Sequence, residues 1–365
     1  MTCMLLKNLH QAITKKASFS KYLLLLWPLY QLSRLPFSRI YLLDLAVSLA
    51  IILQIKKIKL NHPLLKPLVI FLSASTLSLL VVFISGSGSL TAVLYLLRLF
   101  LYSFLLFIYL PKDASSLLKI SFFTIPILGI LQYIFFPDLR FLKLIGYDDH
   151  YFRLTFPFLD PNYTGAILSF TFLYSIKNIK KKSNKILLGL SLIALALTFS
   201  RISFLGLLIG SAYLVFRKKK LQPLIILVQL GLIFLVAISP KPFGEGVNLK
   251  RTFSITARVD NFKKGLDLFI AHPVTGVGYN TLPFSLSKHS SAGLDNSLLF
   301  ILATTGMLGF TSFVYLVFKI NSFVQDPYLK AALISLVIHS LSNNTLFYAP
   351  VTILIFLSLN LSART

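Results

Sequence analysis

Apolar residues run through the chain in long stretches that short polar segments separate. A transmembrane helix needs about 20 predominantly apolar residues, within a range of about 17 to 25. The stretches predict about twelve such helices, near residues 20–33, 39–55, 65–84, 90–110, 118–137, 161–176, 186–199, 202–216, 221–239, 296–318, 329–343 and 346–361. We therefore predict an all-α polytopic membrane protein, with residues 1–365 forming a single integral membrane domain.

Loop charges give an independent test of this pattern. With the N-terminus inside, the inner loops and termini contain 22 lysines and arginines, opposed only by Asp113 and Asp326. Such an excess on one side is what the positive-inside rule requires. It predicts a multi-pass protein of the cytoplasmic (inner) membrane with both its N- and C-termini in the cytoplasm.

The amino-acid composition excludes several other classes of protein, soluble enzymes among them. Of the 365 residues, 56% are hydrophobic and 13% charged, whereas soluble domains carry about 25% charged residues. The net charge of +25 is interpreted as attraction of the loops to anionic lipid and not as nucleic-acid binding. Cys3 is the single cysteine, and the six histidines form no metal-binding motif. We therefore expect no intrachain disulfide, no metal and no cofactor.

Two predicted outer segments are long, residues 138–160 and residues 240–295. In a protein of tight turns, a large outer loop before the tenth helix is the natural place for function. Within it, a region near 258–271 has the periodicity of an amphipathic helix, with apolar positions at Val259, Phe262, Leu266 and Phe269. Such a helix lies in the outer interface or packs on the membrane domain; the sequence favours neither.

Two charges fall inside predicted spans, Asp44 in the second and Arg98 in the fourth. Intramembrane charges are costly, so they are paired or face a wet cavity. One interpretation is a structural Asp44–Arg98 ion pair. The other places Arg98 at the floor of an outward-facing cavity, where it meets an anionic substrate.

Three further arginines stand at separate outer helix ends: Arg153, Arg201 and Arg258. The planar guanidinium binds phosphate oxygens in pairs, so arginines at successive helix mouths suit a phosphate or pyrophosphate. Anchoring at the interface would explain any one of them alone.

Acid–base candidates on the outer side are few. Asp295 and Asn296 open the tenth predicted span, His289 lies six residues earlier, and the other long loop contains Asp148-Asp149-His150. Asp295 is either a catalytic base or only the N-cap of the helix, a position that favours aspartate by itself. A carboxylate near several arginines is expected to have a depressed pKa, which would make it a modest base.

Several of these features, taken in order, resemble the O-antigen ligase and O-antigen polymerase superfamily of membrane glycosyltransferases. The resemblance covers roughly residues 40–345 and includes the span count and the large outer loop. Its motifs are Arg153 with Pro161-Asn162, Ser200-Arg201, Arg258 followed by His272-Pro273-Val274-Thr275-Gly276-Val277-Gly278, and Asp295-Asn296 followed by Gly306-Met307-Leu308-Gly309.

The resemblance implies a GT-C-like helical bundle and a metal-independent, inverting glycosyl transfer on the outer face of the membrane. It implies an undecaprenyl-pyrophosphate-linked glycan donor and a glycan or lipid-linked acceptor. Arg153, Arg201 and Arg258 would hold the donor pyrophosphate, with Arg98 as a further candidate. Asp295 stands where the ligase branch has a histidine, which favours an O-antigen or exopolysaccharide polymerase over a ligase; His289 is the other candidate base.

The residues support that chemistry without the resemblance. A pyrophosphate-linked sugar is already activated, so an enzyme needs cations for the leaving group and one base for the acceptor hydroxyl. Two other classes remain open. A lipid-linked oligosaccharide flippase or other polysaccharide transporter would carry charges in several spans. A structural membrane protein would leave the arginines unexplained.

Overall fold

The structure is a computed structural model that describes residues 20–35, 38–58, 61–86, 88–242, 245–282 and 293–363. Within these ranges every regular element is a helix, apart from two isolated β-bridges, Arg34 with Tyr41 and Asp138 with Tyr151. The first six long helices are α2 (Leu42–Gln54), α3 (Leu65–Ile84), α4 (Leu90–Ser103), α5 (Ala114–Phe135), α6 (Pro161–Ser175) and α7 (Lys182–Leu197). The others are α8 (Arg201–Arg217), α9 (Gln222–Ile238), α10 (Phe253–Ala271), α12 (Ser297–Phe323), α13 (Pro327–His339) and α14 (Ala349–Ser362).

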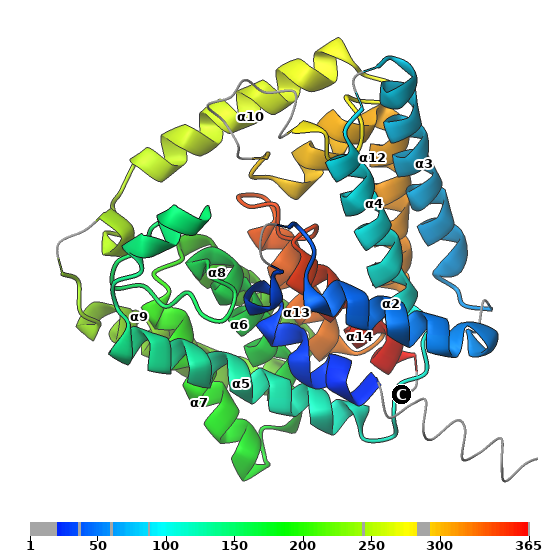
Figure 1. Ribbon diagram of the computed structural model, residues 1–365. Helices are drawn as coiled ribbons and strands as arrows, with labels where there is room; N and C mark the ends of the chain where they lie inside the picture. The colour runs from blue at the N-terminus through cyan, green and yellow to red at the C-terminus, as the bar shows by residue number, and fades with distance from the viewer. Residues whose placement is uncertain are drawn as a thin grey trace, which may run out of the picture.

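The helices form two groups joined by a long bridging helix (Figure 1). Helices α3, α4 and α12 stand together on one side, and α5 to α9 lie on the other, with α13 and α14 between them. Helix α10 crosses one end of the molecule from the first group to the second. It lies in the segment predicted as a large outer loop, and it is longer than the helix predicted near 258–271, since it begins at Phe253.

Each of the twelve predicted spans contains helical residues, but the span count is not confirmed. Four helices are long and apolar enough to cross a membrane: Leu65–Ile84, Ala114–Phe135, Lys219–Ile238 and Ser297–Phe323. Helices α2, α13 and α14 are shorter apolar helices, as is the stretch Leu90–Leu106. Hydropathy counts apolar residues without detecting where the helix breaks, and several of these stretches are broken by turns.

Buried amides satisfy the backbone where helices break. After α4 the chain passes through a 3₁₀ turn, Phe104–Leu106, and the Asn360 side chain on α14 donates to the carbonyls of Leu105 and Ile108 at 2.7 and 2.8 Å. Gln54 accepts the Tyr109 N–H at 2.7 Å and donates to Ser20 Oγ at 2.9 Å. Irregular backbone at membrane depth is tolerated only when protein groups satisfy it in this way.

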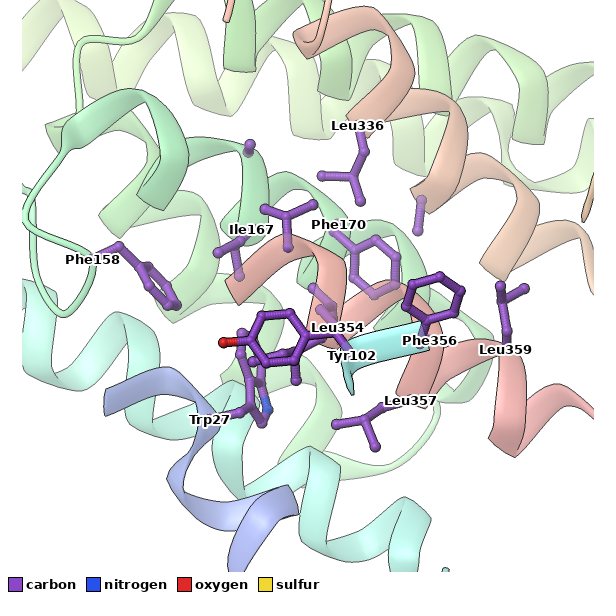
Figure 2. Close-up of a cluster of buried hydrophobic side chains, with 14 of the residues drawn as sticks. Trp27, Tyr102, Phe158, Ile167, Phe170, Leu336, Leu354, Phe356, Leu357 and Leu359 are labelled. Atoms are coloured by element: carbon purple, nitrogen blue, oxygen red, sulfur yellow. The ribbon is translucent and has the colours of Figure 1, made fainter. Parts of the chain in front are cut away.

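The central core is built around α14. Figure 2 shows side chains from five parts of the chain meeting there: Trp27, Tyr102 of α4, Ile167 and Phe170 of α6, Leu336 of α13, and Leu354, Phe356, Leu357 and Leu359 of α14. Trp27 and Phe158 stack with their ring centroids 5.9 Å apart. This packing fixes the segment after Phe158, which leads directly into α6.

Two glycines of the sequence motifs lock the end of α10 against the middle of α12. Gly306 has φ +62° and ψ −164°, which kinks α12. The N–H groups of Met307 and Leu308 then donate to the carbonyls of Pro273 and Val274 at 2.8 and 3.3 Å. A Cβ at Gly306 would lie 2.3 Å from the Val274 oxygen, and one at Gly276 would lie 2.4 Å from the Thr304 carbonyl carbon. Only glycine permits both the left-handed backbone and this approach.

Candidate functional site

Arg153 is held in a buried loop on the way to α6. The N–H of Leu154 donates to the Leu197 carbonyl, and the N–H of Thr155 donates to Gln132 Oε1, both at 2.9 Å. The guanidinium donates from Nε to the Thr198 carbonyl at 2.9 Å. Its Nη2 is buried and has no hydrogen-bond partner among the described residues. Arg153 therefore has a buried hydrogen-bond donor that is available to a ligand.

Arg201 begins α8 after the tight turn that closes α7. Its Nη1 donates to the carbonyls of Leu249 and Arg251 at 3.0 and 3.1 Å, and its Nη2 donates to Ser254 Oγ at 2.9 Å. The preceding residue, Ser200, donates to Asn162 Oδ1 at 3.0 Å. The Pro161-Asn162 and Ser200-Arg201 motifs are thus joined directly.

Arg258 projects from α10 toward the loop between α13 and α14. Its Nε donates to the Ser342 carbonyl at 2.8 Å, and its Nη2 lies 3.5 Å from Asn343 Oδ1. Burial lowers the pKa of Arg258, while the carboxylate of Asp295 opposes that shift and the neighbouring Arg201 adds to it.

These three arginines share one electrostatic environment. Burial lowers the pKa of Arg153, and the positive charges of Arg251, Arg258 and Arg201 lower it further, with Asp160 opposing them. Guanidinium groups keep their charge in proteins. Partly desolvated cations that repel one another favour an anion between them.

An open groove of about 740 Å³ lies between α8 and α10. Its cations are Arg201, Arg258 and Lys263, and the rest of its lining is mostly apolar, from Ile202, Leu205, Ile255, Val259, Phe262, Leu266 and Leu341. The apolar stripe predicted on α10 therefore faces this groove at three of its four positions, Val259, Phe262 and Leu266. A groove with an apolar wall and guanidinium groups suits a ligand with a lipid tail and an anionic head.

Asn296, not Asp295, caps α12. The Asn296 Oδ1 accepts the N–H groups of Leu298 and Leu299 at 2.9 and 3.0 Å. The backbone N–H of Asp295 donates to Asn261 Oδ1 on α10 at 2.8 Å. In the described part of the chain, nothing donates to the Asp295 carboxylate. Its place is therefore not explained by helix capping.

The pKa expected for Asp295 from the sequence is corrected by the structure. Burial raises the pKa of Asp295, and the like charges of Asp148 and Asp160 raise it further, while Arg258 alone opposes them. The sequence indicated the arginines but did not show the partial burial of this carboxyl or the proximity of Asp148 and Asp160. A raised pKa makes the carboxylate a stronger base than an exposed aspartate.

Arg98 occupies a different position from the other arginines. Its Nη2 donates to Asp44 Oδ2 at 2.7 Å and to the Arg39 carbonyl at 2.7 Å, and its Nε lies 3.1 Å from Asp44 Oδ1. Tyr102 also donates to that carboxylate. The structure thus contains the ion pair that was one of the two interpretations, and Arg98 does not line the groove between α8 and α10.

The other acid–base candidates are His289 and the loop cluster Asp148-Asp149-His150. His289 lies outside the described residues. Asp148 and Asp149 are exposed, and His150 is buried. Burial lowers the pKa of His150, although the charge of Asp160 opposes this. Of this loop cluster, Asp148 is the member whose charge reaches Asp295.

Two residues that the sequence did not single out belong to the same region. Arg251 exerts the largest neighbouring charge effect on Arg153, and it donates to the Gly246 carbonyl at 2.8 Å. Tyr163, near the start of α6, stacks on Tyr348 with ring centroids 3.9 Å apart and planes within 9°. Position near a helix end was the one signal available for Tyr163, and aromatic residues are common at such positions in membrane proteins.

The fold and the site define a multi-pass membrane protein with a groove that combines cationic and apolar side chains, near a half-buried carboxyl group. Comparison with protein-family models agrees with that class: residues 186–314, roughly a third of the chain, match the O-antigen ligase family. The resemblance predicted from the motifs is therefore confirmed. The matched segment includes Arg201, Arg258, Asp295 and Gly306, while Arg153 precedes it. No curated protein matches the chain.

Proposed function

We propose that this protein is a polysaccharide polymerase that transfers glycan repeat units from a polyprenyl-pyrophosphate donor, in the undecaprenyl form, to a growing glycan. The observation that carries the proposal is a mostly apolar groove lined by Arg201 and Arg258, with Arg153 close enough to feel the charges of both. The lipid tail lies along the apolar wall, and the arginines bind the pyrophosphate oxygens. Asp295 replaces the ligase histidine, which favours polymerisation over ligation to a lipid core.

The reaction is a direct displacement at the anomeric carbon. An acceptor hydroxyl oxygen attacks that carbon as the bond to the pyrophosphate oxygen breaks, and the configuration inverts. The Asp295 carboxylate accepts the hydroxyl proton, which general-base catalysis requires. The arginines stabilise the negative charge that develops on the leaving polyprenyl pyrophosphate. No metal takes part in this scheme, and the active site faces the outside of the cytoplasmic membrane.

Lysine substitution tests the arginines, because lysine keeps the charge but loses the bidentate fork. We expect Arg153→Lys, Arg201→Lys and Arg258→Lys to be inserted normally and to reduce polymer about 10- to 100-fold, the loss of one or two charge-assisted hydrogen bonds. Arg140→Lys is the matched control: Arg140 lies in the same predicted outer segment as Arg153, residues 138–160, but it is exposed and pairs with Asp138 at 2.6 Å. It should make normal polymer.

The location of the accumulated substrate separates a polymerase from a flippase. In cells with the lysine variants, single lipid-linked repeat units should collect on the outer leaflet, where an impermeant glycosidase digests them. Units trapped on the inner leaflet would instead indicate a transporter. Wild-type polymer from all three lysine variants would reduce these arginines to interface anchors.

A further inference from the structure

A second cavity, of about 330 Å³, lies beside the arginine site and has a different lining. Tyrosines from several elements surround it, among them Tyr30, Tyr41, Tyr95, Tyr102, Tyr163 and Tyr348. Its volume is at the lower end of the range of about 300 to 1,000 Å³ for small-molecule sites. It suits one small polar group rather than a lipid chain.

The polar groups of this cavity are effectively uncharged. Arg98 lines it, but its charge is compensated by Asp44, since both side chains are only 11% exposed and lie 2.7 Å apart. The remaining polar side chains of the lining are the phenols, the hydroxyl of Thr352 and three amides, Gln31, Asn280 and Asn344. The Asn280 side chain has no hydrogen-bond partner in the part of the chain that the structure describes. It therefore has donors and an acceptor available to a ligand.

The rim of the cavity adjoins the proposed reaction centre at three points. Gly293 lines the cavity, and its carbonyl accepts from Asn261, the residue that also holds the Asp295 N–H. Asn344 lines it and follows Asn343, which Arg258 approaches. Tyr163 lines it three residues after Asp160, whose charge reaches both Arg258 and Asp295.

From this geometry we infer that the tyrosine-lined cavity binds an uncharged sugar residue at the end of the acceptor glycan. A sugar ring has apolar C–H faces that pack on aromatic rings and hydroxyls that pair with amides and phenols. A pyrophosphate is disfavoured there because the one arginine is already neutralised. The assignment of this sugar to the acceptor glycan rests on the proposed function, whereas the binding of a sugar in the cavity does not.

Binding measured without any donor lipid tests this inference. The full-length protein in lipid nanodiscs is titrated with free neutral sugars, namely hexoses, N-acetylhexosamines and 6-deoxyhexoses with their methyl glycosides, and separately with inorganic pyrophosphate. Saturation-transfer NMR reports the sugars, and calorimetry reports the pyrophosphate. The cavity variants are Asn280→Gly and Tyr95→Ala. Asn280 has φ +55°, so glycine removes its amide without backbone strain.

We expect at least one sugar class to bind the wild-type protein and each cavity variant to bind it about 2- to 12-fold more weakly, as the loss of one neutral contact predicts. Both variants should bind pyrophosphate normally. Arg258→Lys should show the opposite pattern. Tyr315→Ala is the matched control, because Tyr315 lies on α12 outside the cavity lining.

Binding of no sugar class, or sugar binding that Arg258→Lys abolishes and both cavity variants retain, would overturn the inference. The proposed function fails separately, if the arginine variants form normal polymer while the cavity still binds sugar. Thermal unfolding of every variant shows whether a loss of binding comes from misfolding, and Tyr95→Phe, which keeps the ring, should retain most of the affinity.

Discussion

The side chain of Asn261 holds Asp295 in place: its Oδ1 accepts the Asp295 backbone N–H at 2.8 Å. Its Nδ2 donates to the Gly293 carbonyl at 3.2 Å, so one side chain of α10 fixes the turn before α12. Arg258 lies three residues earlier on α10, which places it on the same face of that helix. The proposed base and one proposed pyrophosphate ligand are therefore positioned by a single helix.

The roles of Asp295 and Asn296 separate in a pair of variants. Asp295→Asn should be inserted and folded like the wild type but should lose about 10²- to 10⁴-fold in transfer rate, the usual effect of removing a general base. Transfer is measured in vesicles supplied with lipid-linked repeat units.

Asn296→Ala supplies the comparison. It removes the N-cap of α12, so it should lower the free energy of unfolding by about 0.5 to 2 kcal/mol and leave the transfer rate per folded molecule within severalfold of wild type. Near-full activity of Asp295→Asn would exclude Asp295 as the base and make His289 the next residue to test.

The raised pKa of Asp295 predicts the pH dependence of the reaction. The base works only when ionised, so kcat/KM should fall as the pH drops through this pKa, at a higher pH than for an ordinary aspartate of about 3.9. Asp148→Asn removes a like charge that raises the pKa. The acidic limb of the profile should therefore move to lower pH.

Asp149→Asn is the matched control for that shift. Asp149 is the neighbouring exposed carboxylate, and it is not among the charges that raise the pKa of Asp295. Its acidic limb should stay where it is in the wild type. Because Asp148 is exposed, the difference should shrink at high ionic strength. Identical limbs in all three proteins at low salt would contradict a titrating Asp295.

The kink of α12 predicts a strong stability difference between two glycines. Gly306→Ala places a Cβ 2.3 Å from the Val274 oxygen in a left-handed backbone. It should destabilise the protein by about 2 kcal/mol or more, from the left-handed conformation and the clash together. Gly189 on α7 has open space around it, so Gly189→Ala should be neutral or stabilising by up to about 1 kcal/mol. Thermal unfolding in detergent compares the two variants. Equal stability would contradict the close contact between the kink of α12 and the segment that follows α10.

Topology is tested by thiol labelling in intact cells. After Cys3 is replaced by serine, cysteine at the exposed Thr256 should react with a membrane-impermeant reagent, because α10 lies in the predicted outer loop. Cysteine at the exposed Lys180, in a predicted inner loop, should react only after the membrane is opened. The reverse pattern would invert the predicted orientation of the termini and the site.

Many residues of the candidate site could be predicted from the sequence, because they were chosen by their position relative to the predicted helices. Arg153, Arg201 and Arg258 each stand near an end of a helix predicted from the apolar runs. In the structure Arg201 does begin α8, whereas Arg258 lies inside α10. The cost of burying a charge in the membrane left two interpretations of Arg98 open, and the ion pair with Asp44 was one of them. What position could not show was distance: that Arg251 neighbours Arg153, or that Asp148 acts on Asp295 across more than a hundred residues of chain.

The sequence by itself determined the membrane class, the helical composition and the order of the family motifs, because hydrophobicity and motif spacing are local properties of a chain. Only the tertiary structure decided three matters. It transferred the cap of α12 from Asp295 to Asn296, it raised the pKa of Asp295 by burial, and it placed Arg98 on a tyrosine-lined cavity apart from the arginine groove. Each depends on contacts between segments far apart in the chain, whose burial and electrostatics arise only when the helices pack.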